Sequence, residues 1–167
     1  MKALNFKALP VTYLILFCNI LFAQTTYWKT VDLGTTVDLY GANSKFVTGN
    51  SGKIFYTSNG GLNWSEQQSN TANTLRSVAS NSINSVTLAV GSNGTILRTT
   101  NNGLLWSAVN SGTSITLYSV TFSTINYCFA VGAGGTILKS TNAGVNWVTM
   151  NSGVVNELHS VLTSGTS

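Results

Sequence analysis

The side chains in this sequence that could act as acids, bases or anion ligands are few, and they lie far apart along the chain. The four carboxylates are those of Asp32, Asp38, Glu66 and Glu157. Enzymatic cleavage of a sugar linkage needs two carboxyl groups on opposite sides of the bond that breaks, and we expect no two of these four to line one face. Two arginines of the later chain, Arg76 and Arg98, could hold an anionic substrate, but their surroundings in sequence differ, so they need not converge. We therefore predict no catalytic residue within this chain.

The histidine and the second cysteine also give no sign of a reactive site. His159 is the lone histidine, and one imidazole without partner ligands does not predict a metal site. Cys128 lies in an apolar stretch, where no neighbouring charge would lower the pKa of its thiol. We expect Cys128 to be a small core residue. No metal and no cofactor is predicted.

The chain repeats itself, and a repeat must be identified before other patterns are interpreted. Trp64, Trp106 and Trp147 are separated by 42 and 41 residues. A glycine precedes each tryptophan by fifteen residues, a leucine follows it by eleven and a valine by fourteen; these residues are Gly49, Gly91, Gly132, Leu75, Leu117, Leu158, Val78, Val120 and Val161. Agreement at four positions in three copies predicts three equivalent structural units.

Two incomplete units flank the three copies. Trp28 is followed by Gly34 and Leu39 at the offsets that glycine and leucine take after Trp106, so we interpret residues 26–35 as the end of a unit that lacks its start. The complete repeats are predicted at approximately 36–72, 73–113 and 114–154, and residues 155–167 open another. The first of these copies is shorter, with about five residues missing between Ala42 and Phe46.

Each unit reads as four short strands. In the third unit the strands are predicted at Leu117–Phe122, Tyr127–Val131, Thr136–Ser140 and Val145–Met150, because β-branched, aliphatic and aromatic runs are bounded there by Gly and Asn. Four strands in about 40 residues is the size of a propeller blade. We predict an all-β fold, a β-propeller of which this chain holds about three and a half blades. The Trp28 strand would complete a final blade. A solenoid is the alternative, although its repeats are usually shorter or helical.

The turn before each tryptophan has the pattern [ST]-x-N-x-G-x-x-W. Its three copies consist of Thr57, Asn59, Gly61 and Trp64, of Thr99, Asn101, Gly103 and Trp106, and of Ser140, Asn142, Gly144 and Trp147. The asparagine oxygen can accept backbone N–H groups across the turn, and the glycine permits a positive φ. The tryptophan can cover the hairpin if its indole N–H finds a partner. These residues predict a structural turn.

This turn resembles the Asp-box, or BNR repeat, of sialidase-type propellers, in which aspartate usually takes the place of the asparagine. The longer phrase AVGxxGTIL[RK][ST]TNxG, together with L-x-S-V, most closely resembles the photosystem II stability/assembly factor-like propellers, a group that includes many secreted bacterial proteins. The resemblance covers Tyr27 to Val161 and implies the fold, not an activity. Sialidases resembling this repeat use an arginine triad, a tyrosine paired with a glutamate and an aspartate acid, a set that Arg76 and Arg98 do not reproduce.

Two positions of the repeat vary in residue type while their neighbours do not. The position after the first-strand leucine holds Tyr40, Arg76, Tyr118 and His159, and a position on the third strand holds Tyr56, Arg98 and Lys139. In equivalent blades each set would form an arc on one surface. Aromatic and cationic side chains in such an arc could bind a peptide or a sugar. The alternative is that these positions vary because they are exposed.

Residues 1–23 read as a cleavable signal peptide. Lys2 and Lys7 precede an apolar run from Val11 to Phe22, and the small residue Ala23 marks the cleavage point. The run is too short to favour a membrane-spanning helix. The remaining residues, 24–167, carry six basic and four acidic side chains, a net charge of +2 without a basic cluster. We therefore expect no nucleic acid ligand and, after cleavage, no membrane contact.

The expected protein is a secreted, periplasmic or cell-surface propeller without catalytic function. It would act as a protein-binding, scaffold or assembly-factor-like module, with another protein or a cell-surface glycan as its partner. Two alternatives remain open: the N-terminal part of a glycoside hydrolase or sialidase-like enzyme whose catalytic residues lie in other blades, and a structural repeat module of a large adhesin-like surface protein. A chain that ended at Ser167 would expose blade edges and would be expected to self-associate.

Overall fold

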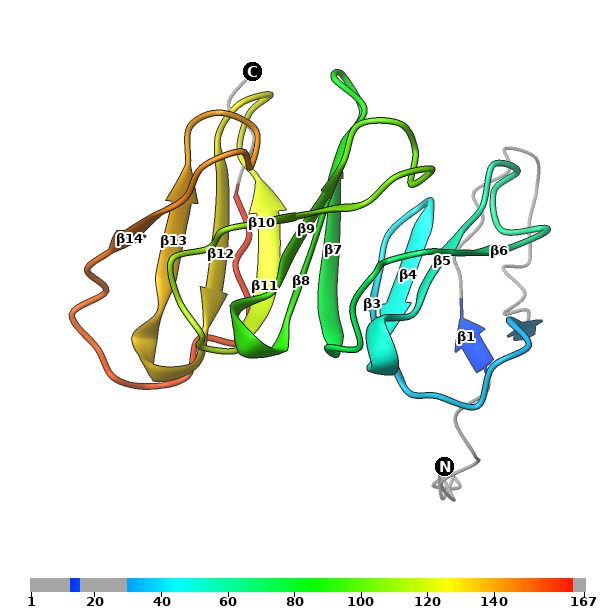
Figure 1. The fold of residues 1–167 in the computed structure, drawn as a ribbon, viewed down its shortest axis with the longest axis horizontal. Coiled ribbons are helices and arrows are strands. Elements are labelled where there is room, and N and C mark those ends of the chain that lie inside the picture. The colour runs from blue at the N-terminus through cyan, green and yellow to red at the C-terminus, as the bar shows by residue number, and fades with distance from the viewer. Residues whose placement is uncertain (1–12, 16–29, 164–167) are drawn as a thin grey trace, which may run out of the picture.

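The structure, a computed structural model, describes residues 13–15 and 30–163, and its main body is three four-stranded antiparallel sheets (Figure 1). We call these sheets blades 1, 2 and 3. Blade 1 consists of β3 (Leu39–Ala42), β4 (Phe46–Gly49), β5 (Ile54–Tyr56) and β6 (Ser65–Gln67). Blade 2 consists of β7 (Leu75–Asn81), β8 (Val86–Gly91), β9 (Ile96–Thr99) and β10 (Ser107–Val109). Blade 3 consists of β11 (Leu117–Phe122), β12 (Cys128–Gly132), β13 (Ile137–Ser140) and β14 (Val148–Met150).

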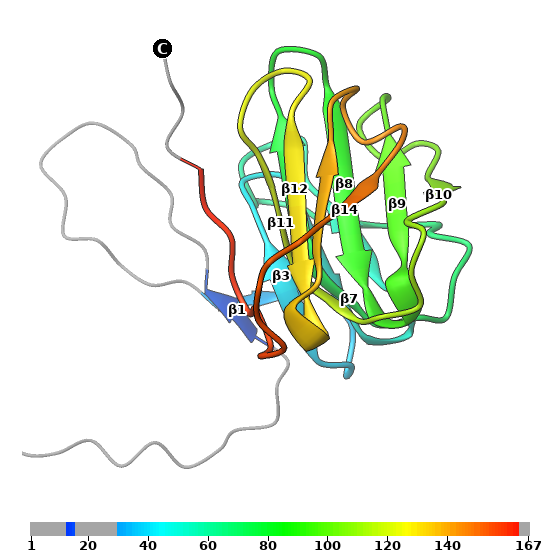
Figure 2. The ribbon, with the colours of Figure 1, turned by 90° about the vertical axis from the view of Figure 1, so that its left-hand side faces the viewer.

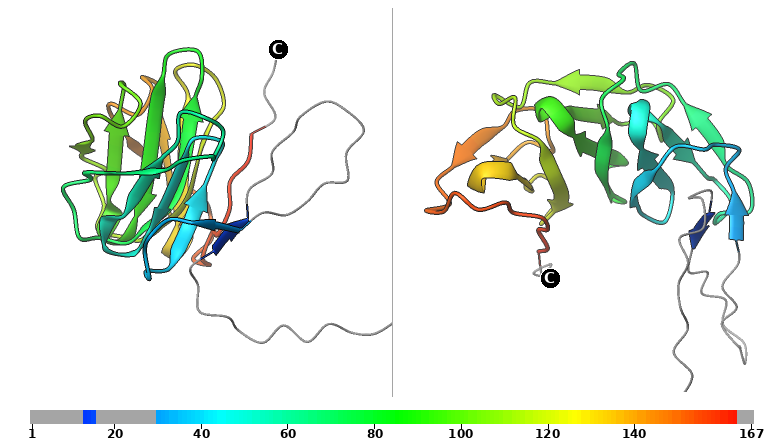
Figure 3. Two further views of the ribbon diagram at one scale, coloured as in Figure 1. Left: turned by 90° about the vertical axis from the view of Figure 1, so that its right-hand side faces the viewer. Right: turned by 90° about the horizontal axis from the view of Figure 1, so that it is seen from below.

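The blades stand side by side in an arc. Each strand pairs with the strand that precedes it in its blade, so the sheet order follows the chain. The first strands, β3, β7 and β11, lie on the concave side of the arc, and the fourth strands lie on the convex side (Figure 3). Viewed along the arc, the sheets stand one behind another (Figure 2). The all-β expectation is confirmed, and the described part of the chain has no α-helix.

The repeated glycine at the end of each second strand is explained by a close backbone approach. Short 3-10 turns, η1 (Asn50–Gly52), η2 (Ser92–Gly94) and η3 (Ala133–Gly135), join the second strand of each blade to the third. A Cβ atom at Gly91 would lie 1.9 Å from the carbonyl oxygen of Thr74, and one at Gly132 would lie 2.1 Å from that of Thr116. Any side chain would displace the segment that leads into the first strand, so only glycine fits.

The hydrophobic core lies between blades, not within one. The cluster between blades 1 and 2 contains Phe46, Ile54, Leu75, Val78, Ala89, Leu97 and Trp106. The cluster between blades 2 and 3 contains Leu88, Val90, Ile96, Leu117, Val120, Cys128, Ala130, Leu138 and Trp147. In both clusters the tryptophan of one blade packs against the blade before it. A single blade therefore cannot bury its own apolar faces, as in other repeat architectures.

A short N-terminal strand stands where a preceding blade would be. Strand β2 (Thr30–Asp32) is followed by the buried Leu33, which clusters with Val47 and Phe55 on the far face of blade 1. Trp64 packs against this cluster, as Trp106 and Trp147 pack against theirs.

Strand β2 pairs with β1 (Tyr13–Ile15), antiparallel to it. The rest of the predicted signal peptide and Trp28 lie outside the described residues. Cleavage after Ala23 would remove β1 together with the signal segment. Strand β2 would then be held by its contacts with blade 1.

The segment after blade 3 docks as the first strand of another blade would. The amide of Leu158 donates to the carbonyl of Gly132 at 3.0 Å. The amide of Val161 donates to the hydroxyl of Ser119 at 3.2 Å, just as the amide of Val120 donates to the hydroxyl of Ser77 at 3.3 Å. The segment thus repeats the contact between the first strands of blades 2 and 3, although it belongs to no sheet.

The predicted fourth strand of the third unit started too early. It begins at Val148, not at Val145, because the residues between belong to the turn. The amide of Val145 donates to the backbone carbonyl of Asn142 at 3.3 Å, and the amide of Asn146 donates to its side-chain oxygen at 2.9 Å. These bonds close the turn before the chain can pair with β13.

Candidate binding row on the inner strands

The first strand of each blade, β3, β7 or β11, lies on the concave side of the arc (Figure 3), and we call it the inner strand. A β-bulge in each inner strand turns one side chain out of the sheet. The pairing of β3 with β4 is interrupted between Leu39 and Gly41, that of β7 with β8 between Leu75 and Ser77, and that of β11 with β12 between Leu117 and Ser119. The residues left unpaired are Tyr40, Arg76 and Tyr118. A bulge of this kind re-aims its side chain while the residues around it keep their register. The variable position of the repeat is therefore the bulge residue.

The bulge residues contact one another across the blades. The guanidinium carbon of Arg76 lies 5.2 Å from the ring centre of Tyr40 and 5.5 Å from that of Tyr118. The ring of His159, at the equivalent place in the next segment, lies 5.0 Å from the ring of Tyr118 at an angle of 34°. Distances of this size allow cation–π attraction and aromatic packing. We call Tyr40, Arg76, Tyr118 and His159 the inner-strand row.

Carboxylates lie at both ends of the inner-strand row. The hydroxyl of Tyr118 donates to Oε1 of Glu157 at 3.2 Å, and Nε2 of His159 lies 3.3 Å from Oε2 of the same carboxylate. At the other end the hydroxyl of Tyr40 approaches Oδ2 of Asp38 at 3.5 Å. Desolvation, and then the charge of Glu157, raise the pKa of Tyr118 above its usual value, so its hydroxyl stays a donor at neutral pH.

This placement corrects the expectation that no two carboxylates share a face. Asp38 and Glu157 each precede the first-strand leucine by one residue, so they occupy the same repeat position. An alignment of the four leucines, Leu39, Leu75, Leu117 and Leu158, contained that signal. The two carboxylates are separated by the side chains of the row and bond to different tyrosines, which suits an extended binding surface.

Arg76 is the central cation of the row. It takes part in no ion pair within the part of the chain that the structure describes, and its Nε atom is buried without a hydrogen-bond partner. A buried donor that lacks a partner costs about 1–3 kcal/mol. Because Nε is covered by the protein, a bound molecule would have to contact the terminal nitrogens of this guanidinium.

The second predicted set does not form a row. Tyr56 packs against Phe46 with ring centres 5.1 Å apart. Arg98 donates from Nε to the carbonyl of Ala143 at 2.8 Å, and Nζ of Lys139 lies 5.4 Å from the ring centre of Tyr127. Within the described residues we find no hydrogen bond, ion pair or aromatic contact between any two of the three. The blades carry different neighbours at this position, so each side chain takes a local partner.

The three turns before the tryptophans share one hydrogen-bond network. In blade 2 the hydroxyl of Thr99 donates to Oδ1 of Asn101 at 2.8 Å and accepts from the amides of Asn101 at 3.3 Å and Gly103 at 3.1 Å. The same Oδ1 accepts from the amide of Leu105 at 3.0 Å. Thr57 and Asn59 in blade 1, and Ser140 and Asn142 in blade 3, form the same bonds. The asparagine side chain takes part in this network through its oxygen alone, which an aspartate also offers.

The tryptophans that follow these turns differ in their polar contacts. The indole N–H of Trp64 donates to the carbonyl of Gly61 at 3.1 Å, and that of Trp147 donates to the carbonyl of Gly144 at 3.2 Å. The indole N–H of Trp106 is buried and has no partner.

Other reactive groups lie apart from the inner-strand row. Cys128 is fully buried, and desolvation raises the pKa of its thiol to about 11, which keeps it protonated at neutral pH. The described residues contain no group of three or more His, Cys, Asp or Glu side chains that could hold a metal ion. No helix among them is long and apolar enough to cross a membrane.

Similarity to known proteins is found at the level of solved structures. No protein-family model matches the sequence, and no curated protein matches it. A structure of YCF48 bound to a D1 peptide superimposes with a TM-score of 0.65 and 18% identity, over 84% of this chain and 48% of that one. YCF48 from Cyanidioschyzon merolae superimposes with a TM-score of 0.54 and 16% identity, over 78% of this chain and 49% of that one. An ancestral GH74 enzyme gives a TM-score of 0.54 and 23% identity, over 72% of this chain and 19% of that one.

The chain has the fold of a β-propeller. Its neighbours in structure are a photosystem II assembly factor and a propeller enzyme, so the expected resemblance to assembly-factor propellers is confirmed for the fold. The chain spans about half the length of the YCF48 structures and about a fifth of the GH74 enzyme. At these identities the likeness concerns the fold alone, and fold does not determine activity.

Proposed function

We propose that this propeller is a non-catalytic module that binds an extended segment of a partner protein along the inner-strand row. The observation that carries the proposal is the position of Arg76 between the rings of Tyr40 and Tyr118. Arginine and tyrosine are, with tryptophan, enriched among the residues that dominate binding energy at protein interfaces. Here their side chains are already ordered by one another, which lowers the entropy lost on binding.

The charge pattern of the row suits an extended peptide better than a compact ligand. Asp38 and Glu157 lie near its ends and Arg76 lies at its centre. A segment with a central acceptor or carboxylate and cationic groups to either side would match these charges. That one propeller of the same fold has been solved with a bound peptide supports this type of ligand without identifying it.

Two of the carboxylates already have partners within the protein, which favours a binding function over hydrolysis. Glu66 forms an ion pair with Lys53, and Glu157 is bonded to Tyr118 and His159. A glycosidase pair must instead face one substrate bond from both sides, at about 5–10 Å from each other. We further propose, from the signal-like residues 1–23, that the protein is exported and acts outside the cytoplasm.

A peptide-display selection would test the proposed function. A random peptide library is selected on the purified protein, and enriched peptides are measured by fluorescence anisotropy against wild type, Arg76→Ala and Tyr118→Ala. Loss of a hot-spot side chain should weaken binding about thirtyfold. Lys45→Ala, which removes an exposed cation from a turn away from the row, is the matched control and should change affinity less than twofold. Equal binding by wild type and both row variants would refute the proposal.

A catalytic parent protein is the second candidate, favoured by the match to the ancestral GH74 enzyme. In that case the carboxylates that act on a polysaccharide would lie in blades outside this chain. The sequence encoded next to this chain decides the matter: paired carboxylates or clustered arginines on the loops of further repeats would favour an enzyme. Further repeats without them would favour the binding module or a structural repeat of a larger surface protein.

A further inference from the structure

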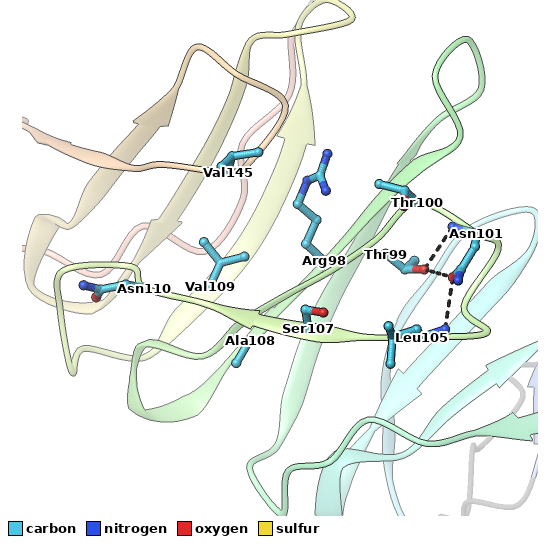
Figure 4. Close-up of a pocket in the computed structure, with 10 residues that line it drawn as sticks. All are labelled: Arg98, Thr99, Thr100, Asn101, Leu105, Ser107, Ala108, Val109, Asn110 and Val145. Carbon is cyan, nitrogen blue, oxygen red and sulfur yellow. Dashed lines mark hydrogen bonds between the residues drawn. The ribbon is translucent and has the colours of Figure 1, made fainter.

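A pocket lies between blades 2 and 3, at the convex side of the arc and away from the inner-strand row. It has a volume of about 380 Å³ and opens to solvent. Its floor is the face of β9 and β10, and Val145 of blade 3 forms part of its wall (Figure 4). The walls combine the apolar side chains of Leu105, Val109 and Val145 with polar groups of Thr99, Thr100, Asn101, Ser107 and Asn110. A volume of this size holds two or three residues of a peptide.

Arg98 projects into this pocket with a fixed orientation. Its Nε donates to the carbonyl of Ala143 in blade 3 at 2.8 Å, so the side chain bridges the two blades. The guanidinium reaches the space between Val145 and Thr100 (Figure 4). Because Nε is held from one side, the terminal nitrogens keep a constant direction. A preorganised guanidinium loses little entropy when it binds an anion.

The positive charge of Arg98 has no counter-charge in the described part of the chain. The ion pairs there are Lys53 with Glu66 and His159 with Glu157, and no hydrogen bond joins the terminal nitrogens of Arg98 to the protein. A half-buried guanidinium in a recess is partly desolvated, so an anion gains more there than at an open surface.

The residues that replace Arg98 at the equivalent position of the other blades have different neighbours. Tyr56 occupies the equivalent position in blade 1 and packs against Phe46 at the junction with blade 2. Lys139 occupies it in blade 3 and lies over the ring of Tyr127. Arg98 alone of the three extends to the following blade, and it does so beside the exposed side chains of Leu105 and Val145.

We propose that the Arg98 pocket binds the carboxylate of a peptide whose adjacent side chain is apolar. The guanidinium would pair with the carboxylate in the two-pronged geometry that arginine and carboxylate share. The apolar side chain would cover Leu105 and Val145, which are 60% and 48% exposed. One arginine matches the single charge of a carboxylate better than the double charge of a phosphate group. The apolar walls match a hydrocarbon side chain better than a sugar.

Titration with a matched pair of small probes tests this site. The probes are N-acetyl-glycyl-leucine and its C-terminal amide, added to the isotope-labelled full chain and followed by NMR shift changes. The free acid should bind at least about tenfold more tightly than the amide, because the amide lacks the charge-assisted bonds. Galacturonic acid is the third probe, and binding of this acidic sugar in preference to the peptide acid would overturn the peptide assignment.

Three variants distinguish binding of the acid in the pocket from a general effect of the protein's positive charge. Arg98→Ala should weaken binding of the acid at least about tenfold. Ser107→Leu should have a similar effect by filling the pocket, because Ser107 lies opposite Arg98 in the pairing of β9 with β10, and this variant keeps the guanidinium itself. Lys139→Ala removes one cation from the equivalent repeat position and should change binding less than twofold.

The outcomes that refute this site differ from those that refute the inner-strand row. Equal binding of acid and amide, full binding by Ser107→Leu, or equal losses in Arg98→Ala and Lys139→Ala would each overturn it. Arg76→Ala should leave binding of the acid unchanged, so that the row and the pocket are tested independently.

Discussion

The two junctions between blades are built from the same repeat but differ in what lies beside the third strand. At the junction of blades 1 and 2, Tyr56 packs against Phe46, and Phe46 meets Trp106 edge-on with ring centres 5.6 Å apart. At the junction of blades 2 and 3, Arg98 spans to Ala143 and leaves a pocket beside it. Beside the third strand, aromatic rings therefore fill the first junction, and one hydrogen bond bridges the second.

This difference shows that the repeat sets the framework while single substitutions set the surface. The leucines, valines and tryptophans of the core are equivalent in both junctions. The third-strand residue that distinguishes the two junctions, Tyr56 at the first and Arg98 at the second, lies at the edge of the core. A long polar side chain can reach water there. A propeller can therefore change its binding sites without changing its packing.

The largest effect is expected at the turn glycine of blade 3. A Cβ at Gly144 would lie 2.5 Å from Cδ2 of the fully buried Leu88, and its φ is 80°. Gly144→Ala should lower the free energy of unfolding by about 3 kcal/mol, from overpacking and backbone strain together. At the other junction Gly103→Ala meets Phe46 at 2.9 Å and should cost about 2 kcal/mol.

Gly153→Ala is the control for this comparison. Gly153 also has a positive φ, of 72°, but a Cβ there would meet nothing within 4 Å. It should cost about 1 kcal/mol, the backbone term alone. Urea unfolding of the three variants measures the series. Equal losses at all three glycines would contradict the idea that these turns pack against the preceding blade.

The buried thiol of the second junction predicts a loss of stability in alkaline solution. Burial raises the pKa of Cys128 from 9.0 to about 11. The folded protein therefore holds this proton more firmly than the unfolded chain, and the stabilisation is complete below about pH 9 and disappears as pH rises through about 11. The free energy of unfolding should fall by about 2 kcal/mol across that window.

The matched variant for this pH effect is Cys128→Ala. It keeps the tyrosines and lysines that also titrate in alkaline solution, so only the thiol contribution is removed. Urea unfolding between pH 8 and pH 11 should give a shallower decline for the variant than for wild type. Parallel declines would mean that Cys128 ionises freely in the folded protein.

The two buried tryptophans distinguish the junctions by one hydrogen bond. Trp147→Phe loses packing and the bond to Gly144, whereas Trp106→Phe loses packing alone, because the indole N–H of Trp106 is already unpartnered. Trp147→Phe should be the more destabilising substitution by about 1 kcal/mol. Thermal unfolding of both variants measures the difference, and a larger loss for Trp106→Phe would contradict the assigned contacts.

The smallest effect is expected from restoring an aspartate in the turn. The Oδ1 of Asn101 accepts from Thr99 and from the amide of Leu105. Asn101→Asp keeps both bonds and makes them charge-assisted, so it should raise the free energy of unfolding by about 0.5 kcal/mol at pH 7. Asn101→Leu is the opposing variant and should be destabilising, since it offers no acceptor. If Asn101→Asp is also destabilising, the amide group has a partner of its own.

Much of the fold followed from spacing alone. The tryptophan, glycine, leucine and valine intervals predicted four-stranded units, and the fold of three such blades is confirmed by the sheets from β3 to β14. The start of the fourth strand was misplaced because Val145 has the composition of a strand residue but belongs to a turn closed by Asn142. Local propensity could not distinguish a strand from a turn at Val145, since the turn depends on the hydrogen bond from the amide of Asn146 to the side chain of Asn142.

The candidate sites were only partly accessible to sequence reasoning. The variable position after the leucine was identifiable, and the structure brings Tyr40, Arg76, Tyr118 and His159 into contact. The functional role of that row remains a prediction. The carboxylates at its ends were not expected to share a surface, although Asp38 and Glu157 hold the same repeat position, because the tyrosines that bond to them are aimed by the bulges.

By itself the sequence determined the repeat, the four-stranded unit and the turn network, because these depend on residues within one period and recur three times. Only the tertiary structure decided which of the variable residues meet. Bulges aim the inner-strand residues along one surface, whereas the third-strand residues each take a different neighbour, and of these Arg98 bonds to the following blade. Contacts of that kind depend on how one blade packs against the next, and no spacing within a blade records that geometry.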